Sequence, residues 1–168
     1  MRRGIRAMEG RLGVELPHLW EMERATPGLL VALARALPLL RYRRKAPCDL
    51  IHLARIGATL AQDCGDCLQI AVNVARGEGV PPAVIEAAVR GWEGKLTTAQ
   101  AAALGFGKRV AGGLDGNEAR AALAAGIGEA AMIELAMAVA SAQLFPVLRR
   151  GMGLAHACRL DLIRYAAP

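Results

Sequence analysis

The chain has 168 residues, the length of one domain, and apolar residues make up 54% of it before its 19 glycines are counted. Ordinary globular proteins reach about 45–50% with glycine included, so the surplus indicates a buried subunit interface in a homo-oligomer. Charged residues interrupt every run of 18 residues, which argues against a membrane span. The net charge of +6 arises largely from local clusters, and aromatic residues are only 4%, so the composition does not predict a partner nucleic acid.

Alanine and leucine dominate almost every segment, and alternating β-type runs are missing, so the sequence predicts an all-α fold. The first helical region is expected from Leu16 to Leu40, with an interruption near Pro27 and an end or kink at Pro38. Later helices are expected to follow proline, threonine and asparagine start signals and to end at glycines. In chain order they cover residues 47–60, 64–76, 82–89, 98–110, 117–126 and 128–150, with a kink at Pro146. We expect one domain over residues 1–168, with residues 1–46 as an N-terminal helical extension.

The segment Cys64-Gly65-Asp66-Cys67 is the strongest candidate for a chemical site. Two cysteines three residues apart can react with one another when they open a helix, where unpaired backbone N–H groups favour a thiolate. We expect this pair to lie open to oxidant at the helix entrance. The alternatives are two inert buried cysteines or half of a zinc site. Zinc is the weaker alternative because a structural site needs four ligands, and we interpret Cys48 and Cys158 as small apolar fillers.

The stretch from Asp49 to Arg76, DLIHLARIGATLAQDCGDCLQIAVNVAR, resembles the signature of the carboxymuconolactone decarboxylase and alkylhydroperoxidase D-like superfamily. That signature has an acidic residue, an apolar helix with an arginine, and then CxxC. The run Glu134-Leu135-Ala136, followed by Arg149 and Met152-Gly153, is similar to the closing helix of the family. The resemblance covers roughly residues 48–155. It implies an oligomeric helical bundle, assembled as trimers or hexamers.

Two positions depart from the family pattern. His52 stands where the family has glutamate, twelve residues before the first cysteine, and Ala71 stands where it has histidine, four residues after the second. The resemblance implies that these two family side chains, with a water, relay a proton to and from a cysteine. His52 is the best substitute base because imidazole titrates near neutral pH, and a purely structural histidine is the alternative. An unbroken helix would hold His52 about 18 Å from Cys64, so they meet only if the chain folds back before Cys64 or a neighbouring subunit contributes one of them.

The function that this pattern favours is a thiol-dependent peroxidase or disulfide reductase, an antioxidant oxidoreductase with Cys64, Cys67 and His52 as its site. A thiolate reduces a hydroperoxide, an internal disulfide forms through sulfenic acid, and an external dithiol restores the pair. No cofactor and no metal are expected. The protein is predicted to be cytoplasmic, where cysteines stay mostly reduced. The alternatives are a redox-sensing or non-catalytic oligomeric scaffold and, less favoured, a lactone decarboxylase, for which a dithiol has no evident use.

Overall fold

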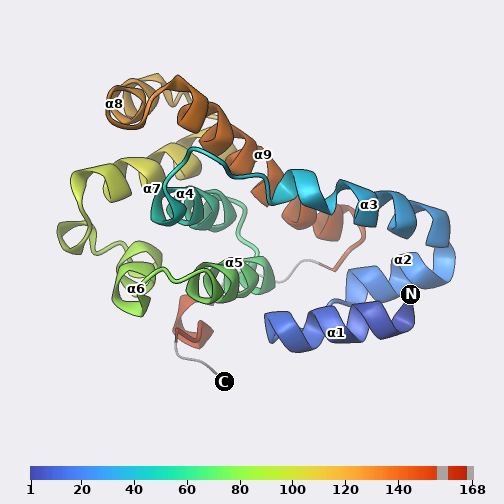
Figure 1. Cartoon of the computed structure of the whole chain (residues 1–168). Helices are drawn as coiled ribbons and strands as arrows, with labels where there is room; N and C mark the ends of the chain where they lie inside the picture. The colour runs from blue at the N-terminus through green and yellow to red at the C-terminus, as the bar shows by residue number, and fades with distance from the viewer. Residues whose placement is uncertain (155–158, 166–168) are drawn as a thin grey trace.

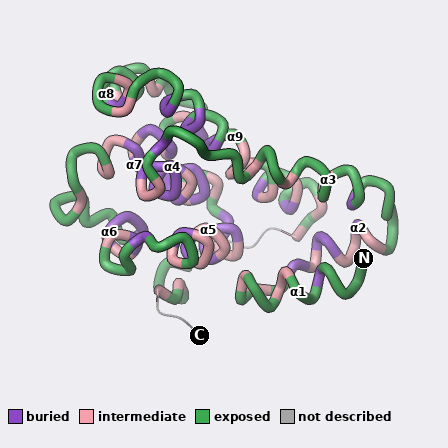
Figure 2. The backbone as a smooth tube through the Cα atoms, in the orientation of Figure 1, coloured by how far each residue is buried: buried purple, intermediate pink, exposed green. Residues whose placement is uncertain are grey.

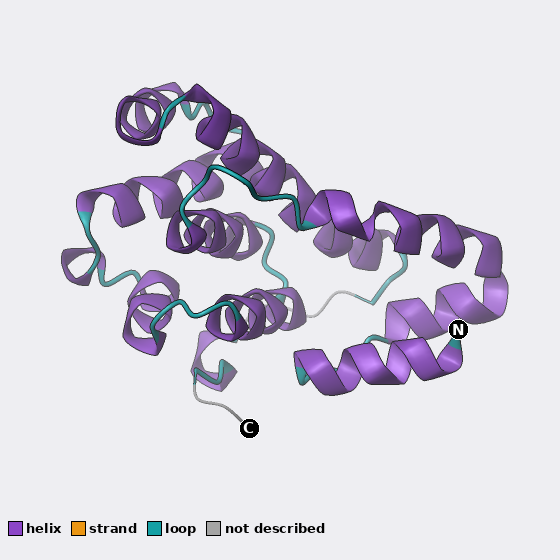
Figure 3. Ribbon diagram, in the orientation of Figure 1, coloured by secondary structure: helices purple, strands orange, loops and turns teal. Residues whose placement is uncertain are grey.

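The computed structural model describes residues 1–154 and 159–165, and these residues form an all-helical protein (Figures 1 and 3). They contain no strand, so the predicted all-α class is confirmed. The helices in chain order are α1 (Arg2–Leu12), α2 (Pro17–Ala25), α3 (Pro27–Leu40), α4 (Cys48–Ala61), α5 (Gly65–Gly77), α6 (Pro82–Arg90), η1 (Glu93–Lys95), α7 (Thr98–Ala111), α8 (Asn117–Ile127), α9 (Glu129–Gly151) and η2 (Leu160–Leu162). The six helices expected after residue 46 are all present, and their ends lie within a residue or two of the predicted ones.

Helix α4 is the centre of the larger core, because nine of its fourteen residues are buried. It packs against α7 and α9, and also against α5 and α6 (Figure 1). The crossing with α7 is a direct contact of backbones: a Cβ at Gly57 would overlap the carbonyl of Leu104, and a Cβ at Gly107 would overlap the carbonyl of Ala54. Glycine at both positions therefore sets how closely these two helices approach.

Helices α1 to α3 form a separate layer with a smaller core of its own. Its buried apolar side chains are Ile5, Leu16, Leu19, Met22 and Leu30. They pack against Ile70 of α5 and against Leu148 and Met152 at the end of α9. The layer thus lies against the bundle of α4 to α9, and much of its surface remains exposed (Figure 2). Helix α1 lies ahead of the helical region that the sequence predicts from Leu16.

A buried carboxylate fixes the connection between this layer and α4. Glu134 of α9 is 7% exposed and accepts backbone N–H groups of Arg44, Lys45 and Ala46 at 2.9–3.2 Å. Burial raises the pKa of Glu134, but these three hydrogen bonds outweigh it, so the pKa of Glu134 is lowered overall. The segment that leads into α4 is therefore held to α9 by hydrogen bonds from its backbone N–H groups to the charged carboxylate of Glu134.

Exposed apolar side chains gather on α3 and α9, where Leu29, Leu39, Ile133 and Val147 are each more than half exposed. By length and composition alone, α9 is also apolar enough to cross a membrane, although 39% of its most apolar window is buried within the protein. A core helix of a soluble protein passes the same test, so this is weak evidence for a span. The expected homo-oligomer stays a prediction.

Candidate active site

The turn between α4 and α5 brings the chain back on itself directly before the cysteine pair. Gln62 caps the end of α4, Asp63 adopts a left-handed backbone with φ of 48°, and Cys64 is the N-cap of α5. Asp tolerates this conformation better than most residues because its short side chain can hydrogen-bond locally. The fold-back that the sequence analysis requires before Cys64 is therefore present, and α4 and α5 pack against each other.

Cys64 and Cys67 are joined as a disulfide, with their Cα atoms 5.3 Å apart. Both are buried: Cys64 is 2% exposed and Cys67 is 6% exposed. The expectation of a pair open to solvent at the helix entrance is wrong in this respect, because both sulfurs are buried, and Cys67 faces a cavity that residues of the α1 to α3 layer help to enclose. Access must therefore run through the interior.

A cavity of about 190 Å³ provides that access. It lies between the two layers, and Cys67, but not Cys64, is among the described residues that line it. Its wall is mostly apolar, with side chains from both layers: Met8, Leu12, Leu16, Leu19, Leu37 and Leu40 from the first, and Ile70, Ala71, Val74, Ala142 and Phe145 from the second. Residues 1–46, predicted as an N-terminal helical extension, thus contribute one wall of the cavity that Cys67 lines.

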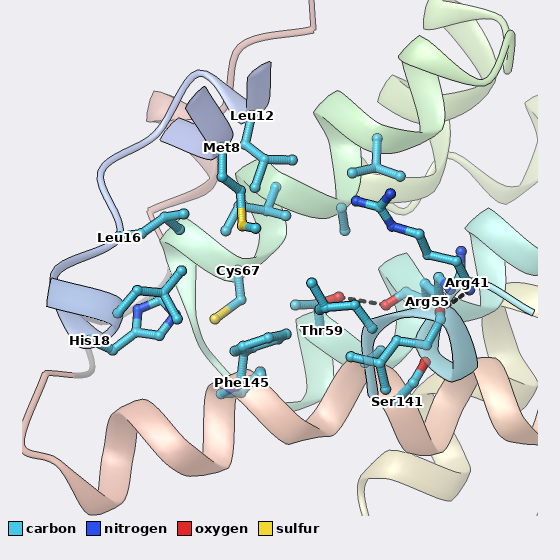
Figure 4. Close-up of a pocket in the computed structure, with 18 of the residues that line it drawn as sticks. Met8, Leu12, Leu16, His18, Arg41, Arg55, Thr59, Cys67, Ser141 and Phe145 are labelled. Carbon is cyan, nitrogen blue, oxygen red and sulfur yellow. Dashed lines mark hydrogen bonds between the residues drawn. The ribbon is translucent and has the colours of Figure 1, made fainter. Parts of the chain in front are cut away.

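His18 of α2 lies in the same cavity, and the sequence analysis gave it no part in the site. Its ring packs at 5.6 Å from the ring of Phe145, and Figure 4 shows the Cys67 sulfur turned toward this side of the cavity. The side chain is 2% exposed, and Nδ1 makes no hydrogen bond within the described residues. Burial and the neighbouring Arg149 lower the pKa of His18 to about 4, and Asp66 only partly offsets them. His18 is therefore a neutral, buried imidazole near the sulfurs.

His52 also lines the cavity, but its Nε2 faces a carboxylate. Nε2 lies 3.2 Å from Oε2 of Glu78, the residue that caps α5, at an ion-pair distance but without an aligned hydrogen bond. Burial lowers the pKa of His52 against the raising effect of Glu78. Its role as a relay base stays a prediction. Ala71, at the family's histidine position, faces the cavity with only a methyl group.

The charge of Asp66, which lies between the two cysteines in sequence, is compensated by a buried arginine. Arg149 of α9 is 1% exposed, pairs with Asp66, and also donates to the carbonyl of Leu154 at 3.1 and 3.3 Å. A nearby aspartate by itself disfavours thiolate formation, because its negative charge raises the pKa of a thiol. The partner arginine weakens that objection because it places a positive charge beside the same carboxylate.

The far side of the cavity from Cys67 carries positive charge. Arg41 and Arg55 line it there, as Figure 4 shows, and Arg55 also donates to the carbonyl of Leu40 at 2.7 Å. The cavity therefore joins a sulfur at one side to two guanidinium groups at the other, with apolar walls between them.

The remaining cysteines differ in what the structure shows. Cys48 is partly buried at the start of α4, with its sulfur 3.6 Å from the carbonyl oxygen of Glu78 and 3.9 Å from Oε2 of the same residue. It thus has polar neighbours, unlike the apolar filler that the sequence predicts. Cys158 lies outside the described residues.

No family model, curated protein or solved structure matches this chain. The resemblance to the alkylhydroperoxidase D-like superfamily therefore depends on the quoted residues alone.

Proposed function

We propose that this chain is a thiol-dependent peroxidase of the alkylhydroperoxidase D-like type, in which the Cys64–Cys67 pair reduces a small organic hydroperoxide with a hydrocarbon body. The observation that carries the proposal is the position of Cys67 in the wall of a largely apolar cavity. A redox-active CxxC needs a sulfur that its substrate can reach, and a largely apolar cavity that Cys67 lines can supply that contact.

Cys67 is the attacking sulfur and Cys64 the resolving one. The cavity reaches Cys67, whereas Cys64 is almost fully buried behind it at the N-cap of α5. The Cys67 thiolate attacks one oxygen of the hydroperoxide, the O–O bond breaks, and the alcohol leaves after taking up a proton. Cys64 then attacks the sulfur of the resulting sulfenic acid, and water leaves as the disulfide forms. An external dithiol returns two electrons and two protons to the pair.

The proton exchanged in these steps needs a group in the cavity, and the cavity offers two neutral imidazoles. His18 lies toward the Cys67 side, and His52 faces Glu78. A neutral imidazole can accept the thiol proton and return it to the leaving alkoxide. His18 is the better placed of the two, so we assign the relay to His18 first and to His52 second. Because the pKa of His18 is about 4, its ring would carry the proton only in passing from the thiol to the alkoxide.

The substrate class follows from the two sides of the chamber. The apolar wall favours a hydroperoxide with a hydrocarbon body, and Arg41 and Arg55 favour a carboxylate at its far end. The exposed apolar side chains of α3 and α9 support assembly into a homo-oligomer, for which the resemblance implies a trimer or hexamer. The cytoplasmic location predicted from cysteine usage belongs to the same proposal.

The test uses reduced protein in a single turnover with an organic hydroperoxide. In Cys64→Ser, a sulfenic acid accumulates on Cys67 and is trapped by a dione reagent, as identified by mass spectrometry. In Cys67→Ser, no trapped product forms at Cys64. Cys48→Ser is the matched control and reacts like the wild-type protein. Trapping on Cys64, or equal consumption of hydroperoxide by Cys67→Ser, contradicts the assignment.

The redox-sensing scaffold remains the second candidate because both sulfurs are buried and Ala71 supplies no proton carrier. Repeated turnover with excess dithiol separates the two functions. A peroxidase consumes many equivalents of hydroperoxide, whereas a sensor forms its disulfide once and stops.

A further inference from the structure

A second cluster of reactive side chains lies where α4 begins and α5 ends. Cys48 and His52 are four residues apart on α4, so they share one face of the helix, and Glu78 caps α5 beside them. A sulfur, an imidazole nitrogen and a carboxylate oxygen from these three residues all lie within 4.8 Å of one another. Neither cysteine of the disulfide belongs to this cluster.

The spacing of these atoms is close to that of ligands around one ion. Donors about 2.0 to 2.3 Å from a tetrahedral zinc ion lie roughly 3.3 to 3.8 Å from each other. Here His52 Nε2 is 3.2 Å from Glu78 Oε2, and Cys48 Sγ is 3.9 Å from the same oxygen. Thiolate, imidazole and carboxylate are also the three ligand types that zinc accepts.

The imidazole of His52 is buried, and its Nε2 faces the carboxylate of Glu78 in poor hydrogen-bond alignment. The side chain is 1% exposed, and Nε2 makes no aligned hydrogen bond although it is directed at the carboxylate. A buried polar atom in this state is costly, and a bound cation would satisfy it. Glu78 is 42% exposed, so an ion can enter from solvent.

One nearby group opposes a cation. Arg43 approaches Oε2 of Glu78 at 3.6 Å, and the two side chains are 38% and 42% exposed. The positive charge of Arg55 also favours the ionised form of the Glu78 carboxyl. The pKa of the Cys48 thiol is raised by burial, and the negative charges of Glu78 and Asp49 add to that effect. Because the Arg43 side chain is near the surface and free to turn away, an ion that binds here displaces it from Glu78.

We propose that Cys48, His52 and Glu78 form a binding site for a zinc-class divalent cation, with three protein ligands and one open coordination position. Binding releases the thiol proton of Cys48, and the two negative ligands balance the charge of the ion. The site ties the start of α4 to the end of α5. It also engages Nε2 of His52, which leaves His18 as the imidazole available to Cys67.

The test uses the oxidised full-length protein after removal of metal by chelation, so that Cys64 and Cys67 cannot act as ligands. Titration with Co²⁺ is expected to produce a thiolate-to-cobalt charge-transfer band at one equivalent, and Zn²⁺ is expected to abolish it by displacement. Cys48→Ser should lose the band, and Glu78→Gln should weaken binding by about tenfold or more. Glu86→Gln, which removes the same charge from an exposed ion pair with Arg90, is the matched control and should bind like wild type.

Arg43→Gln provides the second readout, because removal of the competing cation should tighten binding several-fold. A structural ion pair without a metal role predicts no such gain. A charge-transfer band that survives in Cys48→Ser, equal affinity of the Glu78 and Glu86 variants, or the absence of any band in the wild-type protein would each overturn the site. None of these measurements involves a hydroperoxide, so they are independent of the proposed peroxidase activity.

Discussion

The bundle of α4 to α9 and the layer of α1 to α3 are held together in different ways. In the bundle, α4 and α7 approach until their backbones touch, and many side chains are fully buried. The layer has five buried apolar residues and exposes nearly all of α3, where Leu30 is the one buried side chain. The cavity with Cys67 lies between the two regions. The comparison shows that the closely packed region carries Cys67, whereas the more exposed region supplies the opposite wall of the cavity.

The largest effect is expected in the bundle, at the crossing of α4 and α7. Gly107→Ala forces a methyl group into the backbone of Ala54 and should lower the free energy of unfolding by about 3 kcal/mol or more. Gly105→Ala lies in the same helix with open space around its Cβ and should instead raise that free energy by about 0.5–1 kcal/mol. Urea denaturation measures both values. Equal effects would show that the close approach is not what stabilises the bundle.

The next effect concerns His18, between the two regions. Its pKa in the folded protein is about 4, against 6.5 for the ordinary side chain, so below about pH 6.5 the unfolded state binds the proton more readily. The contribution of His18 to the free energy of unfolding is complete above pH 6.5 and is lost as the pH falls toward 4. The loss from this residue is at most about 3 kcal/mol. His18→Gln should flatten that slope when denaturation curves at pH 7.5 and 4.5 are compared. A slope identical to that of the wild-type protein would place the acid sensitivity elsewhere.

The smallest expected effect is a change in the rate at which the disulfide is reduced, and it should differ between a variant of the layer and a variant of the bundle. Met22→Ala in the layer and Ile85→Ala in α6 each remove a buried apolar side chain and should cost about 2 kcal/mol or more. Only Met22→Ala should speed reduction of the Cys64–Cys67 disulfide by a small phosphine, because it loosens the wall of the cavity. Equal acceleration in the two variants would mean that the phosphine enters by global opening.

Local signals in the sequence were enough to predict most of the bundle. Thr97 and Gln100 form the capping box that begins α7, and Cys64 caps α5 after a turn that Asp63 permits. Pro38 was a weaker signal: it lies inside α3, which continues to Leu40, because only two further residues are needed to complete the last turn.

The cavity could not be predicted in the same way, because its parts meet only through tertiary packing. His18 lies 49 positions before Cys67 in the sequence, in a segment without a recognisable motif, and it joins the site because α2 packs over α5 and α9. The sequence shows that Cys48 and His52 are four residues apart on one predicted helix. It does not show that Glu78 lies beside them, because that contact forms only when the end of α5 packs near the start of α4. The surroundings of Cys67 have the same origin, since part of the cavity wall that it shares comes from the N-terminal layer.

The division of the cavity wall between two regions also bears on how its selectivity can change. The sulfurs, the Asp66–Arg149 pair and the helix crossing belong to the bundle, whereas Met8, Leu12 and Leu37 belong to the layer. Substitutions at Met8, Leu12 or Leu37 can therefore reshape the cavity while Cys64, Cys67 and the Asp66–Arg149 pair keep their positions. Under the proposed function, the range of accepted hydroperoxides would then depend on one end of the chain.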